Sequence, residues 1–406
     1  MTGVWQPIRF AEVATRRLVE IQLGRMLQPA PASSGDDATP YLRAGSLSDL
    51  GSDEFPTMFT SRIDRDRYGI REGDLLVAEG GDAGRSEFAP AVPPGTVIQN
   101  SLHRLRPGPS TDIRFVKYAL EDVYASGWLD IYCNKSTFGH LTYDKLSSLK
   151  IPAPPLILQR QIADYLDVET GRIDGLLAAR RRQVELLALR RRALISSSLD
   201  VGPVVPVRRV ISLCTSGPRG WGDLVCDEGV MFIRSANLVP ESIEIKRGQM
   251  AFVPAQSSVE GSRSRVRAGD TLVGITGANT GWTGLVRVPL DGSFVSQHVA
   301  ILRPAGVLPE WLAYSIASDM GQRALLGSQY GGTKTQLGLE DLRELVIRVP
   351  DLETQRSVIN RIARMETDTA SAIEAMNSQV DLLLERRQAL ITAAVTGQLQ
   401  IPGVAA

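Results

Sequence analysis

Histidine, cysteine and glycine-rich segments are the parts of this 406-residue sequence that could carry catalysis or hold a metal ion. The three histidines, His103, His140 and His298, do not cluster at the spacing of a metal site or a catalytic pair. The three cysteines form no C-x-x-C pair, so neither a zinc site nor a disulfide framework is indicated. The sequence also lacks G-x-S-x-G, H-E-x-x-H and the Asp/Asn-Pro-Pro-aromatic tetrad of amino-methyltransferases. These residues therefore indicate a chain without catalytic or metal-binding residues of its own.

Three glycine-rich segments could approach a phosphate group. Residues 327–335, GSQYGGTKT, resemble a phosphate loop, but the lysine is displaced by one position from G-x-x-x-x-G-K-[ST]. Residues 80–84 and 277–281 follow expected strands but lack the G-x-G-x-x-G spacing and the helix that should open there. We therefore interpret both as tight turns and expect no nucleotide site.

Composition and charge are those of an ordinary globular protein of two or three domains. The 45 basic and 45 acidic residues cancel, which argues against a protein that binds nucleic acid by net charge alone. Arginine nevertheless supplies 39 of the cations, and its planar guanidinium suits phosphates and guanine edges. No apolar run has the length of a membrane helix, and the first residues do not resemble a signal peptide, so we expect a cytoplasmic location.

A long proline-free stretch occurs twice, at residues 159–199 and 355–395. Both copies open on Gln-Arg and close on Arg-Arg-x-Ala-Leu-Ile, and corresponding positions are 196 residues apart. Apolar residues recur at alternating steps of three and four, which is typical of a coiled-coil seam. At 1.5 Å per residue each helix would span roughly 60 Å, so each needs a partner and the other copy supplies one. The expected seam or subunit-interface residues are Leu166, Ile173, Leu177, Val184, Leu187, Leu194, Ile362, Ile373, Met376, Val380, Leu383 and Leu390.

The segments outside the helices repeat as well. The pattern R-x-G-D-x-L-V occurs at residues 71–77 and again at 267–273, and the strand-like segments 100–107 and 296–304 correspond at a similar offset. Residues 115–128 have helical spacing, whereas residues 28–40 are polar and proline-rich and are expected to form a loop. A period near 196 is too long for a solenoid, so each repeat is expected to be a domain followed by a helix.

These patterns predict a mixed α+β fold with two homologous globular domains joined by two long antiparallel coiled-coil helices, related by a pseudo-twofold axis. The expected segments are a first domain at 1–155, a central helix at 156–200, a second domain at 201–352, a C-terminal helix at 353–398 and a tail at 399–406.

Several of these segments resemble a known family, the DNA-specificity subunits of Type I restriction-modification systems. The resemblance is carried by the helix junctions IPAPPLILQRQIADYLD and IRVPDLETQRSVINRIA, and by RRQALITAAVTGQL at residues 386–399. The strands at 71–77 and 232–238 are also similar to that family. In the second junction Asp351 and Leu352 replace the family's usual proline-rich turn.

The resemblance implies a non-catalytic subunit with two target-recognition domains, each reading one half of a split site in double-stranded DNA. It also implies that the helices set the unread gap and dock two methyltransferase subunits, which motor-nuclease subunits join. S-adenosylmethionine, ATP and Mg²⁺ would then be bound by those partners and no cofactor by this chain. Such a complex methylates DNA and defends the cell against foreign DNA.

Loops on a rigid scaffold are the expected readers of DNA, because they can vary without unfolding the domain. Asparagine and glutamine can pair with adenine, and arginine and lysine with guanine. The candidate DNA-binding residues are Arg43, Arg85, Lys135, Thr137 and His140 in the first domain, and Arg234, Asn279, Tyr330, Lys334, Thr335 and Gln336 in the second. Two alternatives remain: a coiled-coil scaffold that does not read DNA, and the specificity subunit of a related standalone methylating or cutting enzyme.

Overall fold

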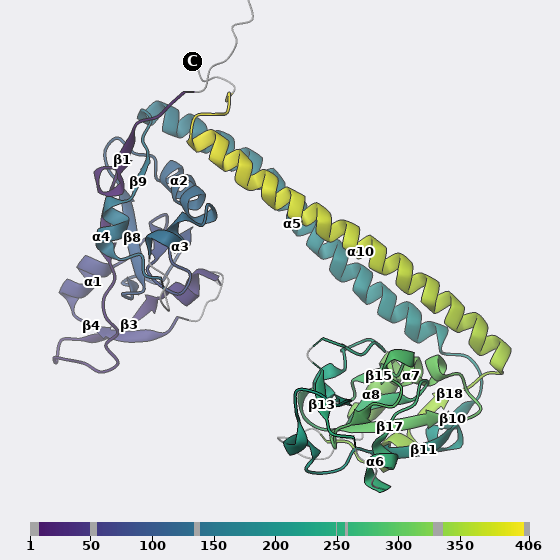
Figure 1. The fold of residues 1–406 in the computed structure, drawn as a ribbon. Helices are drawn as coiled ribbons and strands as arrows, with labels where there is room; N and C mark the ends of the chain where they lie inside the picture. Colours follow the sequence, from purple (N-terminus) through teal and green to yellow (C-terminus); the bar gives the residue numbers. More distant parts are fainter. Residues whose placement is uncertain are drawn as a thin grey trace, which may run out of the picture. The chain divides into compact units, whose positions relative to one another are not determined.

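The computed structural model describes residues 8–48, 55–133, 139–248, 250–255, 259–327 and 336–401. The chain divides into two units: unit 1 comprises Met1–Arg180 with Ser378–Ala406, and unit 2 comprises Arg181–Asn377. Two long helices, α5 (Leu156–Ser198) and α10 (Leu352–Val395), each contribute one part to unit 1 and the other part to unit 2 (Figure 1). We call the remainder of each unit its head.

The described residues of the unit 1 head form three small sheets and four short α-helices. The strand orders are β2-β8-β5-β6, β4-β3-β7 and β1-β9, and the pairing is antiparallel except between β3 and β7. The strands are β1 (Glu12–Ala14), β2 (Val19–Leu23), β3 (Asp37–Leu42), β4 (Thr57–Thr60), β5 (Leu75–Ala78), β6 (Ser86–Phe88), β7 (Val97–Ile98), β8 (Leu102–Pro107) and β9 (Lys150–Pro152). The helices are α1 (Arg62–Tyr68), α2 (Ile113–Ala125), α3 (Trp128–Tyr132) and α4 (Tyr143–Ser148).

The head of unit 2 repeats this topology strand for strand. Its strand orders are β11-β17-β14-β15, β13-β12-β16 and β10-β18, and among these described strands the pairing is antiparallel except between β12 and β16. The strands are β10 (Val204–Pro206), β11 (Ile211–Ser216), β12 (Val230–Ile233), β13 (Ala251–Val253), β14 (Thr271–Gly274), β15 (Thr283–Leu285), β16 (Phe294–Val295), β17 (Val299–Pro304) and β18 (Val346–Arg348). The helices are α6 (Val259–Ser264), α7 (Pro309–Ala317), α8 (Asp319–Gly327) and α9 (Leu339–Glu344). The predicted mixed α+β fold with two repeated heads is confirmed.

One strand at the centre of each head is buried on both faces. All four residues of β5 are buried, and successive side chains alternate between two apolar cores, with Leu75 and Val77 in one and Leu76 and Ala78 in the other. Strand β14 is buried throughout in the same way. Apolar runs bounded by Gly-Asp at the start and glycine-rich turns at the end therefore fix the middle of each head.

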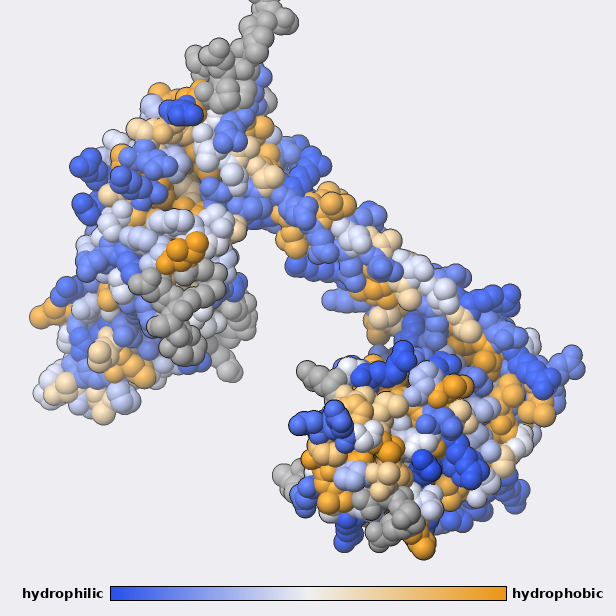
Figure 2. Space-filling view, viewed as in Figure 1, coloured by the Kyte–Doolittle hydropathy of each residue, from blue (hydrophilic) through white to orange (hydrophobic). Residues whose placement is uncertain are grey.

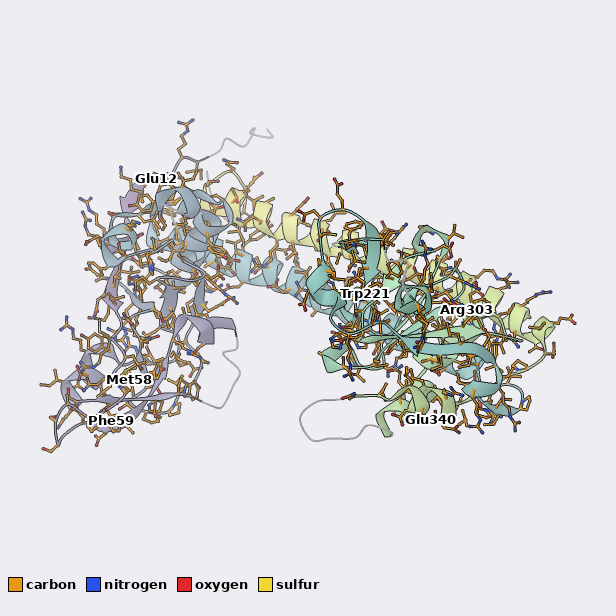
Figure 3. The ribbon with its side chains drawn as sticks, turned by 60° about the horizontal axis from the view of Figure 1, so that its bottom comes forward. Glu12, Met58, Phe59, Trp221, Arg303 and Glu340 are labelled. Atoms are coloured by element: carbon orange, nitrogen blue, oxygen red, sulfur yellow. The ribbon has the colours of Figure 1, made fainter. Side chains whose placement is uncertain are left out.

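A buried ion pair precedes each central strand. Asp74 accepts two hydrogen bonds from the Arg106 guanidinium, each 2.7 Å long, and a third from the backbone N–H of Arg71. In unit 2 Asp270 accepts two bonds of 2.8 Å from Arg303, which Figure 3 labels, and one from the backbone N–H of Arg267. These bonds explain why Gly-Asp recurs before both strands, since glycine supplies a positive φ and the carboxylate closes the turn.

Within each unit the beginning of one long helix packs on the end of the other. In unit 1, Ile162 and Leu166 of α5 share an apolar cluster with Ile391 and Val395 of α10. In unit 2, Ile195 and Leu199, at and just past the end of α5, share one with Val358 and Ile362 of α10. The helix segments are therefore antiparallel within each unit.

A buried glutamine joins each head to the helix that follows it. Gln159 accepts a hydrogen bond from the backbone N–H of Asp112 and donates one to the Pro154 carbonyl, at 2.9 and 2.8 Å. Gln355 does the same with the N–H of Leu308 and the carbonyl of Pro350, at the same two distances. The repeated Gln-Arg opening of the helices thus caps the start of α2 and of α7.

Three local expectations were wrong. The expected loop at 28–40 includes the first residues of β3, where Asp37 to Pro40 pair with β4 although two of them are Asp and Pro. The expected helix at 115–128 breaks at Gly127, whose φ of 69° separates α2 from α3. At the end of α5 the seam moves by one position, because Leu194 is 40% exposed and Ile195 is buried.

Candidate nucleic-acid interface

The end of β5 meets two other segments of unit 1. Glu79, the residue after this strand, donates its N–H to the Ser101 carbonyl at 2.9 Å. Its own carbonyl accepts a bond of 2.7 Å from the N–H of Leu141. The side chains of Glu79, Ser101 and His140 therefore start from neighbouring points of one backbone framework.

The same framework exists in unit 2. Ile275, the residue after β14, donates to the His298 carbonyl and accepts from the N–H of Leu337, both at 2.9 Å. An isolated antiparallel bridge between Thr276 and Gln336 extends this contact. The two frameworks are equivalent, since β5 and β14 occupy the same place in sheets of the same topology.

A glycine-rich turn follows each central strand and is tied to a short 3-10 helix. In unit 1 Arg85 donates from Nη2 to the carbonyl of Leu47, in the 3-10 helix Ala44–Ser48, at 3.3 Å. In unit 2 Asn279 donates from Nδ2 to the carbonyl of Ser235, in the 3-10 helix Ser235–Asn237, at 3.0 Å. Because Ala44 also donates to Ser101 Oγ at 2.9 Å, turn, 3-10 helix and framework form one surface in unit 1.

The side chains on this surface differ between the units. In unit 1 Glu79 is half-buried, and burial raises the pKa of its carboxyl while the nearby His140 acts in the opposite direction. The His140 ring lies so close over Gly80 that a Cβ there would stand 2.9 Å from two ring atoms. At the position of Glu79, unit 2 has Ile275, which is 8% exposed.

Unit 2 instead has a polar network around an exposed histidine. His298 lies 2.6 Å through Nδ1 from Thr276 Oγ1 and 3.1 Å through Nε2 from Gln297 Nε2. An amide nitrogen can only donate, so Nε2 is the acceptor in the contact with Gln297. Gln336, the equivalent of His140, is exposed beside this network. A carboxylate with an imidazole in one unit thus corresponds to an imidazole with amides in the other.

Six of the eleven predicted DNA-binding residues lie in the described parts of the chain, and each belongs to the surface of its own unit. Arg43 and Arg234 are exposed and follow β3 and β12 by one residue, rather than lying on those strands. Arg85 and Asn279 are partly exposed on the glycine-rich turns, and His140 and Gln336 are exposed beside the frameworks. The other five lie outside the described residues: Lys135, Thr137, Tyr330, Lys334 and Thr335.

Sequence reasoning missed Glu79, Ser101, Thr276 and Gln297, and it did not include His298 among the DNA-binding candidates. The available signal was a polar residue directly beside a buried strand. Glu79 follows the last residue of β5, and the pair Gln297-His298 precedes the first residue of β17.

The seam residues have the following exposures. Leu166, Ile173 and Leu177 are buried, and Leu194 is exposed. Ile362 is also buried. The remaining seam residues are partly buried: Val184, Leu187, Ile373, Met376, Val380, Leu383 and Leu390.

No group of three or more His, Cys, Asp or Glu side chains among the described residues could hold a metal ion. No helix in the described ranges combines the length and apolarity needed to cross a membrane.

Several known proteins are similar to this chain. Residues 7–186 match the model of the Type I restriction modification DNA specificity domain. The Type I restriction enzyme EcoBI specificity subunit of Escherichia coli is 20% identical over 395 residues, covering 89% of this chain and 80% of that protein. A solved chain from work on complex assembly and conformational transition of the type I R-M system matches with a TM-score of 0.74 at 16% identity, covering 98% of this chain and 100% of that one. The last likeness concerns the fold. Residues 7–186 thus form a Type I restriction modification DNA specificity domain, and most of the chain is similar to a specificity subunit of a Type I restriction enzyme.

Proposed function

We propose that the two heads read the two halves of a split DNA target, one half each, and that the two halves differ in sequence. The observation that carries this proposal is the pair of equivalent frameworks, one holding Glu79, Ser101 and His140 and the other Ile275, His298 and Gln336. A shared backbone places both sets alike, whereas base edges are distinguished by the donors and acceptors that meet them. Different side chains on one scaffold therefore favour different half-sites.

Within each surface the residue types suggest a division of labour. Arg43 and Arg234 are exposed and flank the framework, which suits contacts to phosphates or guanine. Gln336 and Asn279 carry amides that can pair with adenine. The neighbouring residues Lys135, Thr137, Tyr330, Lys334 and Thr335 remain proposed base or phosphate contacts from their sequence positions alone.

The long helices are proposed to set the unread gap and to dock the partner subunits. Exposed leucines support docking: Leu176, Leu382 and Leu384 in unit 1 are 52, 64 and 42% exposed, and Leu186 and Leu189 in unit 2 are 48 and 57% exposed. Figure 2 shows hydrophobic residues among hydrophilic ones on the surface of these helices. Exposed apolar side chains on a helix are a typical basis for protein association.

We propose that these partners are two methyltransferase subunits and the motor-nuclease subunits, and that this chain contributes recognition rather than catalysis. S-adenosylmethionine would then be bound by the methyltransferase subunits, and ATP and Mg²⁺ by the motor-nuclease. The partners would also supply much of the phosphate contact, which fits a chain of zero net charge.

The test is to co-express the full chain with its cognate methyltransferase subunits and map methylated bases across a genome. We expect one split motif with two different halves and a fixed gap. Methylation without sequence preference would contradict DNA reading and favour a docking scaffold. A motif with two identical halves would contradict the difference between the heads.

A further inference from the structure

Strand β8 of unit 1 contains a histidine that is completely buried. His103 is 0% exposed, and its Nε2 lies 2.8 Å from the carbonyl oxygen of Leu141. Its Nδ1 is also buried and has no hydrogen-bond partner among the described residues. Buried polar atoms are nearly always paired, so an unpaired one calls for a physical reason.

The protonation of this ring follows from its contact. A carbonyl oxygen only accepts, so Nε2 carries the proton and Nδ1 has an unused lone pair. Burial lowers the pKa of His103, which keeps the imidazole neutral. The ring is therefore a fixed donor to a single backbone atom.

Unit 2 shows that the fold does not require this donor. His103 pairs with Val77 across the sheet, and at the equivalent position of unit 2 Ala300 pairs with Val273. Ala300 is 0% exposed, and the same strands form around it. An apolar residue is therefore sufficient for the sheet to form. The imidazole of His103 has a role in unit 1 that has no counterpart in unit 2.

The His103 imidazole holds the backbone beside the surface that the glycine-rich turn, the 3-10 helix and the framework form in unit 1. We call this the recognition surface of unit 1. Leu141 is 0% exposed, its N–H is bonded to Glu79, and its carbonyl is bonded to His103. The preceding residue is His140, whose ring lies over Gly80. In unit 2 Leu337 has the equivalent N–H bond to Ile275, but the residue at the position of the donor is Ala300.

We infer that His103 is a positioning residue for DNA recognition by unit 1: by fixing the Leu141 carbonyl it holds His140 in place against Gly80. This inference rests on the proposed function, because it assigns the held residue to the recognition surface. Reading of one half-site then depends on a buried side chain that does not touch DNA, whereas reading of the other half-site has no such dependence.

The experiment compares His103→Leu, which keeps apolar bulk without a donor, with His103→Gln, whose amide N–H can reach the same carbonyl. Each full chain is co-expressed with its methyltransferase subunits, and methylation is measured on targets carrying single base changes in either half. We expect His103→Leu to reduce discrimination in one half by about five- to tenfold, the scale of one lost hydrogen bond. Discrimination in the other half should stay unchanged, and His103→Gln should restore the affected half.

A second comparison, His103→Asn against His103→Gln, covers the case in which His103→Leu does not fold. His103→Asn also carries an amide but is one methylene shorter than Gln, so it should lose discrimination where His103→Gln keeps it. Retained discrimination in both halves by a folded Leu or Asn variant would overturn the positioning role. An equal loss in both halves would overturn it too, since it would indicate general destabilisation. If the unaltered chain gave no split motif, the proposed function itself would fail, and this outcome is distinguishable from both others.

Discussion

The two units share their internal supports and differ in what those supports carry. Each unit has a buried Asp–Arg pair before its central strand, a glutamine on its long helix that caps a helix of the head, and the same backbone bonds at the end of the central strand. The differences lie on β8 and β17 and on the surface beside them. The two heads therefore share one scaffold, and the polar side chains on that scaffold make them different.

Strand β8 also differs from β17 at the residue next to His103. Arg104 is 3% exposed and donates from Nη1 to the carbonyls of Arg67 and Gly69, at the end of α1. At the equivalent position unit 2 has Ile301, which is 0% exposed within an apolar core. Unit 1 therefore fixes this side of its head through a buried cation where unit 2 uses apolar packing.

The largest expected effect comes from the shared ion pairs. Asp74→Ala and Asp270→Ala should each destabilise their own unit by about 3–5 kcal/mol, because each leaves a partly buried guanidinium without its partner. Denaturation combined with amide hydrogen exchange would measure the loss in each unit. Arg71→Ala is the control: its side chain is 72% exposed, and its ion pair with Asp74 should contribute no more than about 0.5 kcal/mol. Tolerance of either aspartate change would show that the two supports are not equivalent.

The glutamine caps should come next. Gln159→Leu and Gln355→Leu each leave a backbone N–H, that of Asp112 or Leu308, without an acceptor, at a cost of about 1–3 kcal/mol. Protection of α2 and α7 from hydrogen exchange should fall accordingly. The exposed neighbours Arg160 and Arg356, changed to alanine, should alter stability by no more than about 0.5 kcal/mol. An effect on only one of the two helices would show that the Gln159 and Gln355 caps are not equivalent.

Replacing Arg104 tests whether unit 1 can adopt the apolar solution of unit 2. Arg104→Leu removes the donor to two carbonyls and should cost about 1–3 kcal/mol, confined to unit 1. Ile301→Val in unit 2 should cost about 0.5–1.5 kcal/mol through lost packing alone. Thermal unfolding of the two variants gives the comparison, and a neutral or stabilising Arg104→Leu would show that the buried cation is not a support.

The smallest effect is a dependence of unit 1 on pH. Because burial lowers the pKa of His103 below its ordinary 6.5, the unfolded state binds a proton first as the pH falls. The contribution of His103 to stability is therefore complete above about pH 6.5 and declines below it, by at most about 1.4 kcal/mol per pH unit. Unfolding measured at several pH values should show this slope in the unaltered chain and lose it in His103→Gln. An unchanged slope in the variant would contradict a neutral buried ring.

Much of the fold could be predicted because its signals are local and repeated. The offset of 196 between Gln159 and Gln355, and the seam through Leu166 and Ile362, follow from residue type and spacing. The fold of Asp37 to Pro40 could not be predicted, since their extended conformation depends on pairing with β4, a tertiary contact that overrides local preference. The break at Gly127 required knowing that a positive φ is used there.

The candidate site was predicted only in outline. Loop and turn positions such as Arg85 and Gln336 could be chosen from polarity and repeat position. His103 could not, because the sequence does not show that its ring meets the carbonyl of Leu141, 38 residues away. Glu79 was equally hidden, since its position beside His140 depends on how the loop returns to the end of β5.

The most direct test of the central claim is an exchange of one head. Residues 1–150 are replaced by the corresponding head of another specificity subunit, and the methylated motif is mapped with the cognate methyltransferase subunits present. If two equivalent scaffolds read independently, one half of the motif changes while the other half stays as it was. A change in both halves, or in neither, would contradict independent reading by the two heads.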